Sequence, residues 1–533
     1  MEATEKQHPP MTNVPLGMSL LQGCLFSSPW SRKKKLFLRA TVFILTFLCY
    51  MSYHLSRKPP SIVKSVLHNT DKETNDDDDH SSSTSSASAS ALLTSDGGWA
   101  PFDNEHKGEG MLGSLDTAFL ASYAVGMFFS GHLGDRVNLR YFLSAGMILT
   151  GICTTLFGMA YLWNIHSFWY FVVVQVLSGL FQSTGWPSVV SIMGNWFGKG
   201  RRGFVMGVWN ANTSVGNILG ALVASAALGL GWGYSFILPG IIIGGLGVIV
   251  FFFLVVAPPP SASASNDEAK AAEEGSINQD EKFEGGDENE EEIYLLENSK
   301  HQAGREEKKK EKGINFFKAW LIPGVAEFAL ALFFCKLVSY TFLYWLPFYL
   351  KHTEIGGKRL GTSEAGNLST LFDVGGILGG ILAGLLSDTL RGESQATTSA
   401  LMMYLAIPAL YLYRLLGDRS FALNILLMFM GGLFVNGPYS LITTAVSADL
   451  GTHSCLKGDA KALATVTAII DGTGSLGAAV GPFITGWLSS AEDGWDRVFW
   501  MLMGMCGASA LLLSRLVWKE LRKKARLCCR REN

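Results

Sequence analysis

Charged side chains fall within segments that are otherwise apolar and long enough to cross a membrane. Arg57 and Lys58 follow directly on an apolar segment at 36–56, and Lys336 lies inside another at 325–350. A charge in the bilayer is costly unless it is paired or hydrated, so an intramembrane base indicates a functional site. An arginine stays charged there and offers a planar fork to two oxygens of an anion. These bases therefore predict a binding site for an anionic solute.

The depth of Arg57 depends on where its helix ends. Counting from the cytosolic end of the helix places Arg57 and Lys58 near the far membrane surface, to which both side chains could snorkel. The apolar residues Ile62, Val63, Val66 and Leu67 continue a helical stripe past two prolines, however. If the helix extends along that stripe, Arg57 lies deeper, so the sequence leaves a site role and a surface role open.

Two acids also fall in apolar segments, Asp373 at 366–387 and Asp471 at 462–488. Either could neutralise Lys336 when no anion is bound, although both could instead cap helix ends or make polar helix contacts. Lys336 itself either supplies a second charge to an anion or is paired permanently with a buried acid. Hydroxyl and amide groups that could bind phosphate or sugar oxygens are provided by Tyr53, Tyr340 and Asn436, for which core packing is the alternative.

The composition requires many helices to hold these groups. Of 533 residues, 48% are hydrophobic and 17% charged, so the excess apolar surface must face lipid. About 20 apolar residues form one membrane-crossing helix, and twelve such segments are predicted. They fall in two sets of six, so an all-α membrane protein with two pseudo-symmetric halves is expected. The predicted segments are 36–56, 114–134, 140–162, 168–194, 204–228, 235–257, 325–350, 366–387, 397–416, 421–447, 462–488 and 497–517.

Charge in the loops predicts the topology. Short loops rich in Lys and Arg stay in the cytosol, which places both termini there. The expected order is a cytosolic tail at 1–35, a six-helix half at 36–257 with an acidic, Ser-rich lumenal loop at 58–113, a second half at 314–518, and a basic tail at 519–533. Residues 258–313 are rich in acidic residues, Ser and Gly and cannot bury a core, so they are predicted to form a disordered cytosolic linker.

A repeated pattern follows the second span of each half, GHLGDRVNLR at 131–140 and GILAGLLSDTLR at 380–391. Small residues let helices approach closely, and the acid and base that follow can cap or pair across a helix junction. We therefore expect a cytosolic gate made by Asp135, Arg136, Asp388 and Arg391. The alternative is that these are a loop acid and bases that only set topology.

Twelve spans, two halves and the GxxxDR-type loop resemble the major facilitator superfamily over nearly the whole chain. The run FQSTGWPSVVSIMGNWFGKGRRGFVMGVWNANTSVGNILG at 181–220 resembles the signature of the organophosphate:phosphate antiporters. The step YHLSRK at 53–58 resembles the Tyr-Tyr-x-x-Arg-Lys step with which that family presents an arginine to phosphate, with His54 in place of the second tyrosine. Two departures make the site less basic than in bacterial relatives, because Met127 and Thr213 replace a lysine and a histidine.

The resemblance implies two halves that rock about a central site, with phosphate bridging Arg57 and Lys336. Lys336 lies one turn from Ser339, which occupies the position of the family's second arginine. The remaining pattern is similar to animal sugar-phosphate exchangers of the endoplasmic reticulum membrane. It implies exchange of glucose 6-phosphate for inorganic phosphate, with glycerol 3-phosphate or another organic anion as the alternative.

Other classes of function have little support in the sequence. No nucleophile elbow or zinc-ligand spacing is present, so an enzyme is not expected. The eight cysteines show no paired metal-type spacing. No cofactor, metal or nucleic-acid partner is predicted, the lipid bilayer is the expected surrounding, and the oligomeric state stays open.

Overall fold

The computed structural model describes residues 15–18, 32–68, 98–104, 107–134, 137–197, 202–258, 316–389, 394–450, 462–491 and 493–529. Within these ranges the chain is built from helices, and its only strand-like pairing is one isolated bridge between Ile355 and Lys358. Ten of the described helices are long and apolar enough to cross a membrane. The predicted all-α membrane class is confirmed.

The first half contains spans one to six, and three of them are interrupted. The first span is α2 continued by α3, the fourth is α6 followed by α7 after a break at Ser183 and Thr184, and the fifth is α8 followed by α9 after a break at Ala211. The bounds are α2 Arg32–Arg57, α3 Pro59–Leu67, α4 Gly108–Gly134, α5 Leu139–Leu162, α6 Phe168–Gln182, α7 Gly185–Trp196, α8 Arg202–Asn210, α9 Asn212–Ala227 with a 3₁₀ turn at Leu228–Leu230, and α10 Tyr234–Phe253.

The second half contains spans seven to twelve, preceded by a short helix, α13. The tenth span passes into a π-helical turn at Ile442–Val446 before the short helix α18. The bounds are α13 Phe316–Trp320, α14 Val325–His352, α15 Thr362–Thr389, α16 Gln395–Leu416, α17 Phe421–Leu441, α18 Ser447–Leu450, α19 Ala462–Leu488 and α20 Gly494–Cys529.

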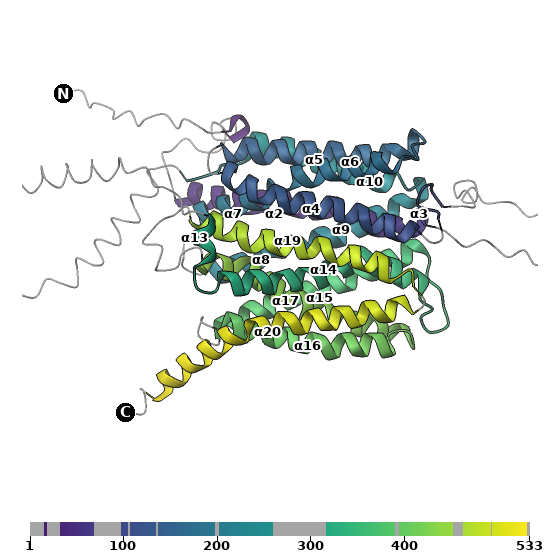
Figure 1. Ribbon diagram of the computed structural model, residues 1–533. Coiled ribbons are helices and arrows are strands. Elements are labelled where there is room, and N and C mark those ends of the chain that lie inside the picture. The colour runs from purple at the N-terminus through teal and green to yellow at the C-terminus, as the bar shows by residue number, and fades with distance from the viewer. Residues whose placement is uncertain are drawn as a thin grey trace, which may run out of the picture.

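Helix contacts repeat between the halves (Figure 1). Within the first half α2 packs on α9, α4 on α6 and α5 on α10, and the corresponding pairs of the second half are α14 with α19, α15 with α17 and α16 with α20. Across the interface α4 packs on α19, and α9 packs on α15. Spans two and eleven therefore meet as spans five and eight do, which is the relation expected for two pseudo-symmetric halves.

The loop predicted at 58–113 is shorter than expected at both ends. Pro59 and Pro60 lie in the first turn of α3, where the missing N–H groups are tolerated, so the prolines begin a helix there. The helix then continues along the apolar stripe to Leu67, and α4 starts at Gly108. Part of the connection folds against the bundle, because Trp99 donates a hydrogen bond to the carbonyl of Ile165 at 3.1 Å.

The first and last spans place the two ends of the helical chain at the same end of the bundle. The start of α2 and the end of α20 lie at one end, and α3 lies at the other (Figure 1). An even number of spans requires this arrangement. Helix α2 begins at Arg32, and α20 continues to Cys529, so helix replaces part of both expected tails. The linker predicted at 258–313 lies outside the described residues except for Pro258, and the compartment at each end stays a prediction.

Glycines set the close approach of matching helices in both halves. Gly216 and Gly220 of α9 lie against α2, and Gly477 and Gly481 of α19 lie against α14, in each case four residues apart. A Cβ at any of these positions would collide with a backbone carbonyl oxygen of the facing helix. Small residues at this spacing let helix backbones approach closely in membranes. The carbonyls that face them are also four apart, those of Met51, Leu55, Phe333 and Leu337.

We expect Gly477→Ala to lower the thermal stability of the purified protein. The added methyl group would overlap the carbonyl oxygen of Phe333 and force α19 away from α14, a strain of about 1–3 kcal/mol. The control is Gly245→Ala, because nothing lies within 4 Å of a Cβ at that position. Thermal unfolding in detergent measures both; equal melting temperatures for the two variants would contradict this packing.

Candidate substrate-binding site

Arg57 is buried between the two halves, with 2% of its surface exposed. Its Nε donates to Oε1 of Gln182 at 2.6 Å, and its Nη1 donates to the hydroxyl of Tyr340 at 3.3 Å. The guanidinium carbon lies 4.5 Å from the ring centroid of Tyr123, a cation–π contact. The side chain is therefore held by α4, α6 and α14, and it does not reach the membrane surface.

One edge of this guanidinium is unused. Nη2 of Arg57 is buried and has no hydrogen-bond partner, and no carboxylate of the described residues lies within 4.0 Å of the group. Burying a charged donor without an acceptor is strongly unfavourable. An anion that accepts a hydrogen bond from Nη2 would remove this cost, so the arrangement is suited to binding one.

The neighbouring lysines differ from Arg57 because carboxylates pair with them. Lys58 donates to the carbonyl of Leu343 at 3.1 Å and lies 3.9 Å from Oδ2 of Asp373. Lys64, one turn into α3, is paired with Asp116 of α4. Lys64 also donates to the carbonyl of Tyr344 at 3.1 Å, so it links the first half to α14 of the second.

Lys336 is paired with Asp471 as well. Its Nζ donates to Oδ1 of Asp471 at 2.7 Å and to the hydroxyl of Ser475 at 3.3 Å. Of the two acids that the sequence offered as partners of Lys336, the structure selects Asp471 and places Asp373 beside Lys58. Oδ2 of Asp471 is buried without a partner, so this pair is less well satisfied than an ordinary buried ion pair.

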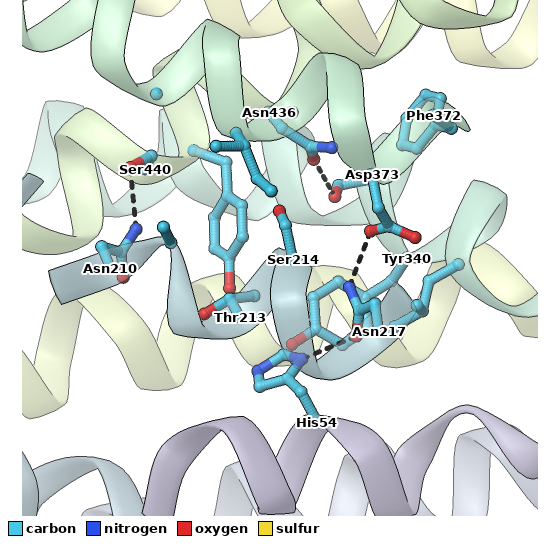
Figure 2. Close-up of a pocket in the computed structure, with 17 residues that line it drawn as sticks. His54, Asn210, Thr213, Ser214, Asn217, Tyr340, Phe372, Asp373, Asn436 and Ser440 are labelled. Carbon is cyan, nitrogen blue, oxygen red and sulfur yellow. Dashed lines mark hydrogen bonds between the residues drawn. The ribbon is translucent and has the colours of Figure 1, made fainter. Parts of the chain in front are cut away.

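A cavity lined by many polar side chains lies between the two halves (Figure 2), and Arg57 contacts one of its lining residues, Tyr340. It is lined by α2, α8 and α9 on one side and by α14, α15 and α17 on the other. A hydrogen-bonded chain crosses its wall, from Nδ1 of His54 to Oδ1 of Asn217 at 3.0 Å and from Nδ2 of Asn217 to Oδ1 of Asp373 at 2.8 Å. Asn210 also crosses the interface, donating to the hydroxyl of Ser440 at 2.7 Å.

The structure brings some of the predicted site residues to the cavity and leaves others out. His54, Tyr340, Asp373 and Asn436 line it, and Ser339 donates to Oδ1 of Asn436 at 2.6 Å. Arg57 borders the cavity through its contact with Tyr340. Residues of the prediction that do not line the cavity are Tyr53, Lys58, Lys336 and Asp471.

Tyr53 lies in an aromatic cluster and not in the cavity. Its ring centroid is 6.3 Å from that of Tyr50, and its hydroxyl is buried without a hydrogen-bond partner. A Cβ placed on Gly185 would collide with the Tyr53 ring, so the absence of a side chain at Gly185 lets the two helices meet. Core packing, the alternative for this tyrosine, is the role that these contacts support.

The predicted gate can be placed only in part. Asp135, Arg136 and Arg391 lie outside the described residues, and Asp388 is exposed near the end of α15. The gate therefore stays a prediction.

Several residues of the site were not predicted from the sequence. Lys64 and Asp116 are an ionisable base and acid in or beside apolar segments, so the rule that selected Lys336 would also have selected them. Gln182 and Asn217 are neutral amides in the signature run, and nothing in their spacing distinguishes them from polar packing residues. Their roles follow only from how α6 and α9 are rotated towards Arg57 and His54.

Residues 82–454 match the family model described as Major Facilitator Superfamily. The chain belongs to that superfamily. Among curated members, a putative glycerol-3-phosphate transporter 1 of Arabidopsis thaliana is 51% identical over 98% of this chain and 95% of its own length. The glucose-6-phosphate exchanger SLC37A2 of Homo sapiens is 50% identical over 94% of this chain and 96% of its own. The resemblance to the organophosphate:phosphate antiporters is thus confirmed, and this multi-pass membrane protein is a member of a transporter superfamily.

A solved structure agrees with this assignment at the level of fold. A bacterial homolog of the human lysosomal transporter Spinster, in an inward-facing and unoccupied conformation, superimposes with a TM-score of 0.53. The match covers 91% of this chain and 95% of the other at 15% identity. At 15% identity, this match shows only that the two proteins share a fold.

The pair of Lys64 and Asp116 should behave as a coupled unit. Breaking a buried ion pair on one side leaves an uncompensated charge, at a cost of about 3–5 kcal/mol. We therefore expect Lys64→Met and Asp116→Leu each to lower the melting temperature strongly, and the double variant to recover most of the loss. If the two losses added in the double variant, the two residues would not be coupled.

Proposed function

We propose that this protein exchanges a sugar phosphate, glucose 6-phosphate foremost, for inorganic phosphate by alternating access. The observation that carries the proposal is the buried, unused edge of Arg57, which lies between the two halves and has no described carboxylate within ion-pair distance. A phosphate monoester and inorganic phosphate share the oxygens that would accept from this edge. The names of the curated relatives, which include both sugar-phosphate and glycerol-phosphate carriers, support this class of substrate.

Binding at Arg57 would draw the two halves together. Gln182 holds the guanidinium from the first half and Tyr340 from the second, so a phosphate on Nη2 adds a contact at their interface. We propose that Lys336, one turn before Tyr340 on α14, supplies the second positive charge when Asp471 releases it. Breaking a buried ion pair leaves both charges uncompensated, so the charge of the phosphate would have to replace Asp471 as the partner of Lys336.

Alternating access requires contacts that open on one side at a time. Near α3, Lys64 bonds to the carbonyl of Tyr344 and Lys351 donates to the carbonyl of Ser65 at 3.3 Å. Nearer the opposite end, Asn210 bonds to Ser440. We propose that each set breaks when the cavity opens to its own side, together with the predicted gate at Asp135, Arg136, Asp388 and Arg391.

Glycerol 3-phosphate is the second candidate substrate, because relatives of similar identity, 51% against 50%, carry that name. Another organic anion would follow if phosphate did not compete. For location we propose the endoplasmic reticulum membrane with both termini in the cytosol. That proposal rests on the basic loops and on the similarity to the animal exchangers.

Arg57→Lys tests the guanidinium directly. Lysine keeps the charge but loses the fork that holds Gln182, Tyr340 and an anion at once. We expect the rate of phosphate:phosphate exchange in proteoliposomes to fall by about 10- to 100-fold, the effect of losing one or two charge-assisted hydrogen bonds. The matched control is Arg414→Lys, an arginine paired with Asp496 at the rim of α16, which should exchange at the normal rate. Full activity of Arg57→Lys would contradict the proposal.

The role of Lys336 is tested by removing its pair as a whole. The double variant Lys336→Met with Asp471→Leu removes both charges, so it should fold where the single variants are destabilised. If Lys336 binds phosphate, the folded double variant exchanges phosphate at least about tenfold more slowly than wild type, as expected for one lost charge-assisted hydrogen bond. Normal exchange by the double variant would make the pair structural.

A further inference from the structure

We propose that the cavity beside Arg57 contains a hydroxyl-recognition subsite built on His54, Asn217 and Asp373. It would take the uncharged polyol part of a phosphate monoester and reject an organic part that carries a second negative charge. This inference deepens the proposed function and rests on it for the position of the phosphate at Arg57. His54 and Asn217 line the cavity from the first half and Asp373 from the second, and hydrogen bonds join the three residues (Figure 2).

The hydrogen-bonded chain fixes where the protons are. A carboxylate only accepts hydrogen bonds, so Asp373 requires the NH₂ group of Asn217 to face it, as the distance of 2.8 Å indicates. The carbonyl oxygen of Asn217 then faces His54. Because that oxygen can only accept, Nδ1 of His54 must carry the proton. In the neutral imidazole Nε2 is then left as an acceptor.

The atoms that remain free are therefore acceptors. Nε2 of His54 is buried and has no hydrogen-bond partner. Oδ2 of Asp373 has only Lys58, at 3.9 Å, beyond hydrogen-bond distance. A ligand hydroxyl can donate to either atom, and at Nε2 of His54 it would remove the cost of an unpaired buried acceptor. A ligand carboxylate offers acceptors alone and would face the negative charge of Asp373.

The rest of the cavity wall agrees with an uncharged, hydrogen-bonding ligand. No Lys or Arg is among the residues that line it, and Lys58, 3.9 Å from the carboxylate of Asp373, is already paired with that acid, so the wall offers no free counter-charge to a second anion. The other polar groups on the wall are amides and hydroxyls, which can both donate and accept. They are Asn210, Thr213, Ser214, Ser339, Asn436 and Ser440, with the tyrosines Tyr340 and Tyr439.

The spacing of the subsite matches one molecule that has a phosphate at one end. His54 and Arg57 are three residues apart on α2, so they share a helix face and differ by about 4.5 Å along its axis. Phosphate at Arg57 would thus place the next few carbons of its ester beside His54. Inorganic phosphate would occupy only the Arg57 end.

The test uses two ligands that differ at one carbon. Glycerol 3-phosphate ends in a hydroxymethyl group where 3-phosphoglycerate carries a carboxylate. The assay measures how each ligand inhibits exchange of labelled phosphate in proteoliposomes. For wild type we expect the inhibition constant of 3-phosphoglycerate to be at least about tenfold higher than that of glycerol 3-phosphate, which corresponds to a penalty of about 1.4 kcal/mol for the carboxylate. Asp373→Asn should bring the two inhibition constants within about threefold, because the repelling charge is gone. Equal inhibition of wild type, or an unchanged ratio in active Asp373→Asn, would overturn the proposal.

Variants of His54 separate recognition from packing. His54→Leu should weaken inhibition by glycerol 3-phosphate about tenfold relative to competition by unlabelled phosphate. His54→Gln keeps an amide that can accept, and should restore most of that ratio. His54 only packs α2 against α9 if His54→Leu changes the inhibition constants of glycerol 3-phosphate and phosphate equally. The same conclusion follows if His54→Gln does not restore the ratio of these two constants.

Failure of the transport proposal can be told apart from failure of the subsite. If wild-type protein exchanges no phosphate, the proposed function fails, and thermal unfolding in detergent then decides the subsite. Stabilisation by glycerol 3-phosphate but not by 3-phosphoglycerate, lost in His54→Leu, supports the subsite without any flux. Equal stabilisation by both ligands, or by neither, overturns it.

Discussion

A positive charge held away from water must find a negative partner, and the interface between the two halves is organised by that requirement. Among the described residues, four lysine and arginine side chains are buried there. In the part of the chain that the structure describes, Lys58, Lys64 and Lys336 each have a carboxylate within 4.0 Å, and Arg57 does not. The one base left over is also the one whose guanidinium has an unused edge. A site with one unbalanced positive charge is suited to binding an anion.

The helical framework explains how this charge is kept in place. Glycine pairs bring α9 against α2 and α19 against α14, which sets the rotation of the helices that carry His54 and Lys336. The fourth span breaks after Gln182, and this residue at the break bonds to Arg57. The continuation of α2 into α3 keeps Arg57 inside the bundle. The glycine pairs, the break in the fourth span and the continuation of α2 into α3 thus position the residues of the site.

The fold could be predicted from the sequence because hydropathy and loop charge are one-dimensional signals. The sequence left two alternatives for the depth of Arg57, and the apolar stripe in α3 predicted the deeper one. The two prolines made the end of the helix uncertain. Which acid faces which base could not be predicted. Asp373 and Asp471 are equivalent in sequence, and only the rotation and packing of α15 and α19 assign the first to Lys58 and the second to Lys336.

A structure of the protein with phosphate bound would show whether the free edge of Arg57 holds the anion. We expect density for a tetrahedral anion within hydrogen-bond distance of Nη2 of Arg57 and beside the hydroxyl of Tyr340. Density for the anion elsewhere, with Nη2 of Arg57 bonded to a protein carboxylate instead, would contradict it.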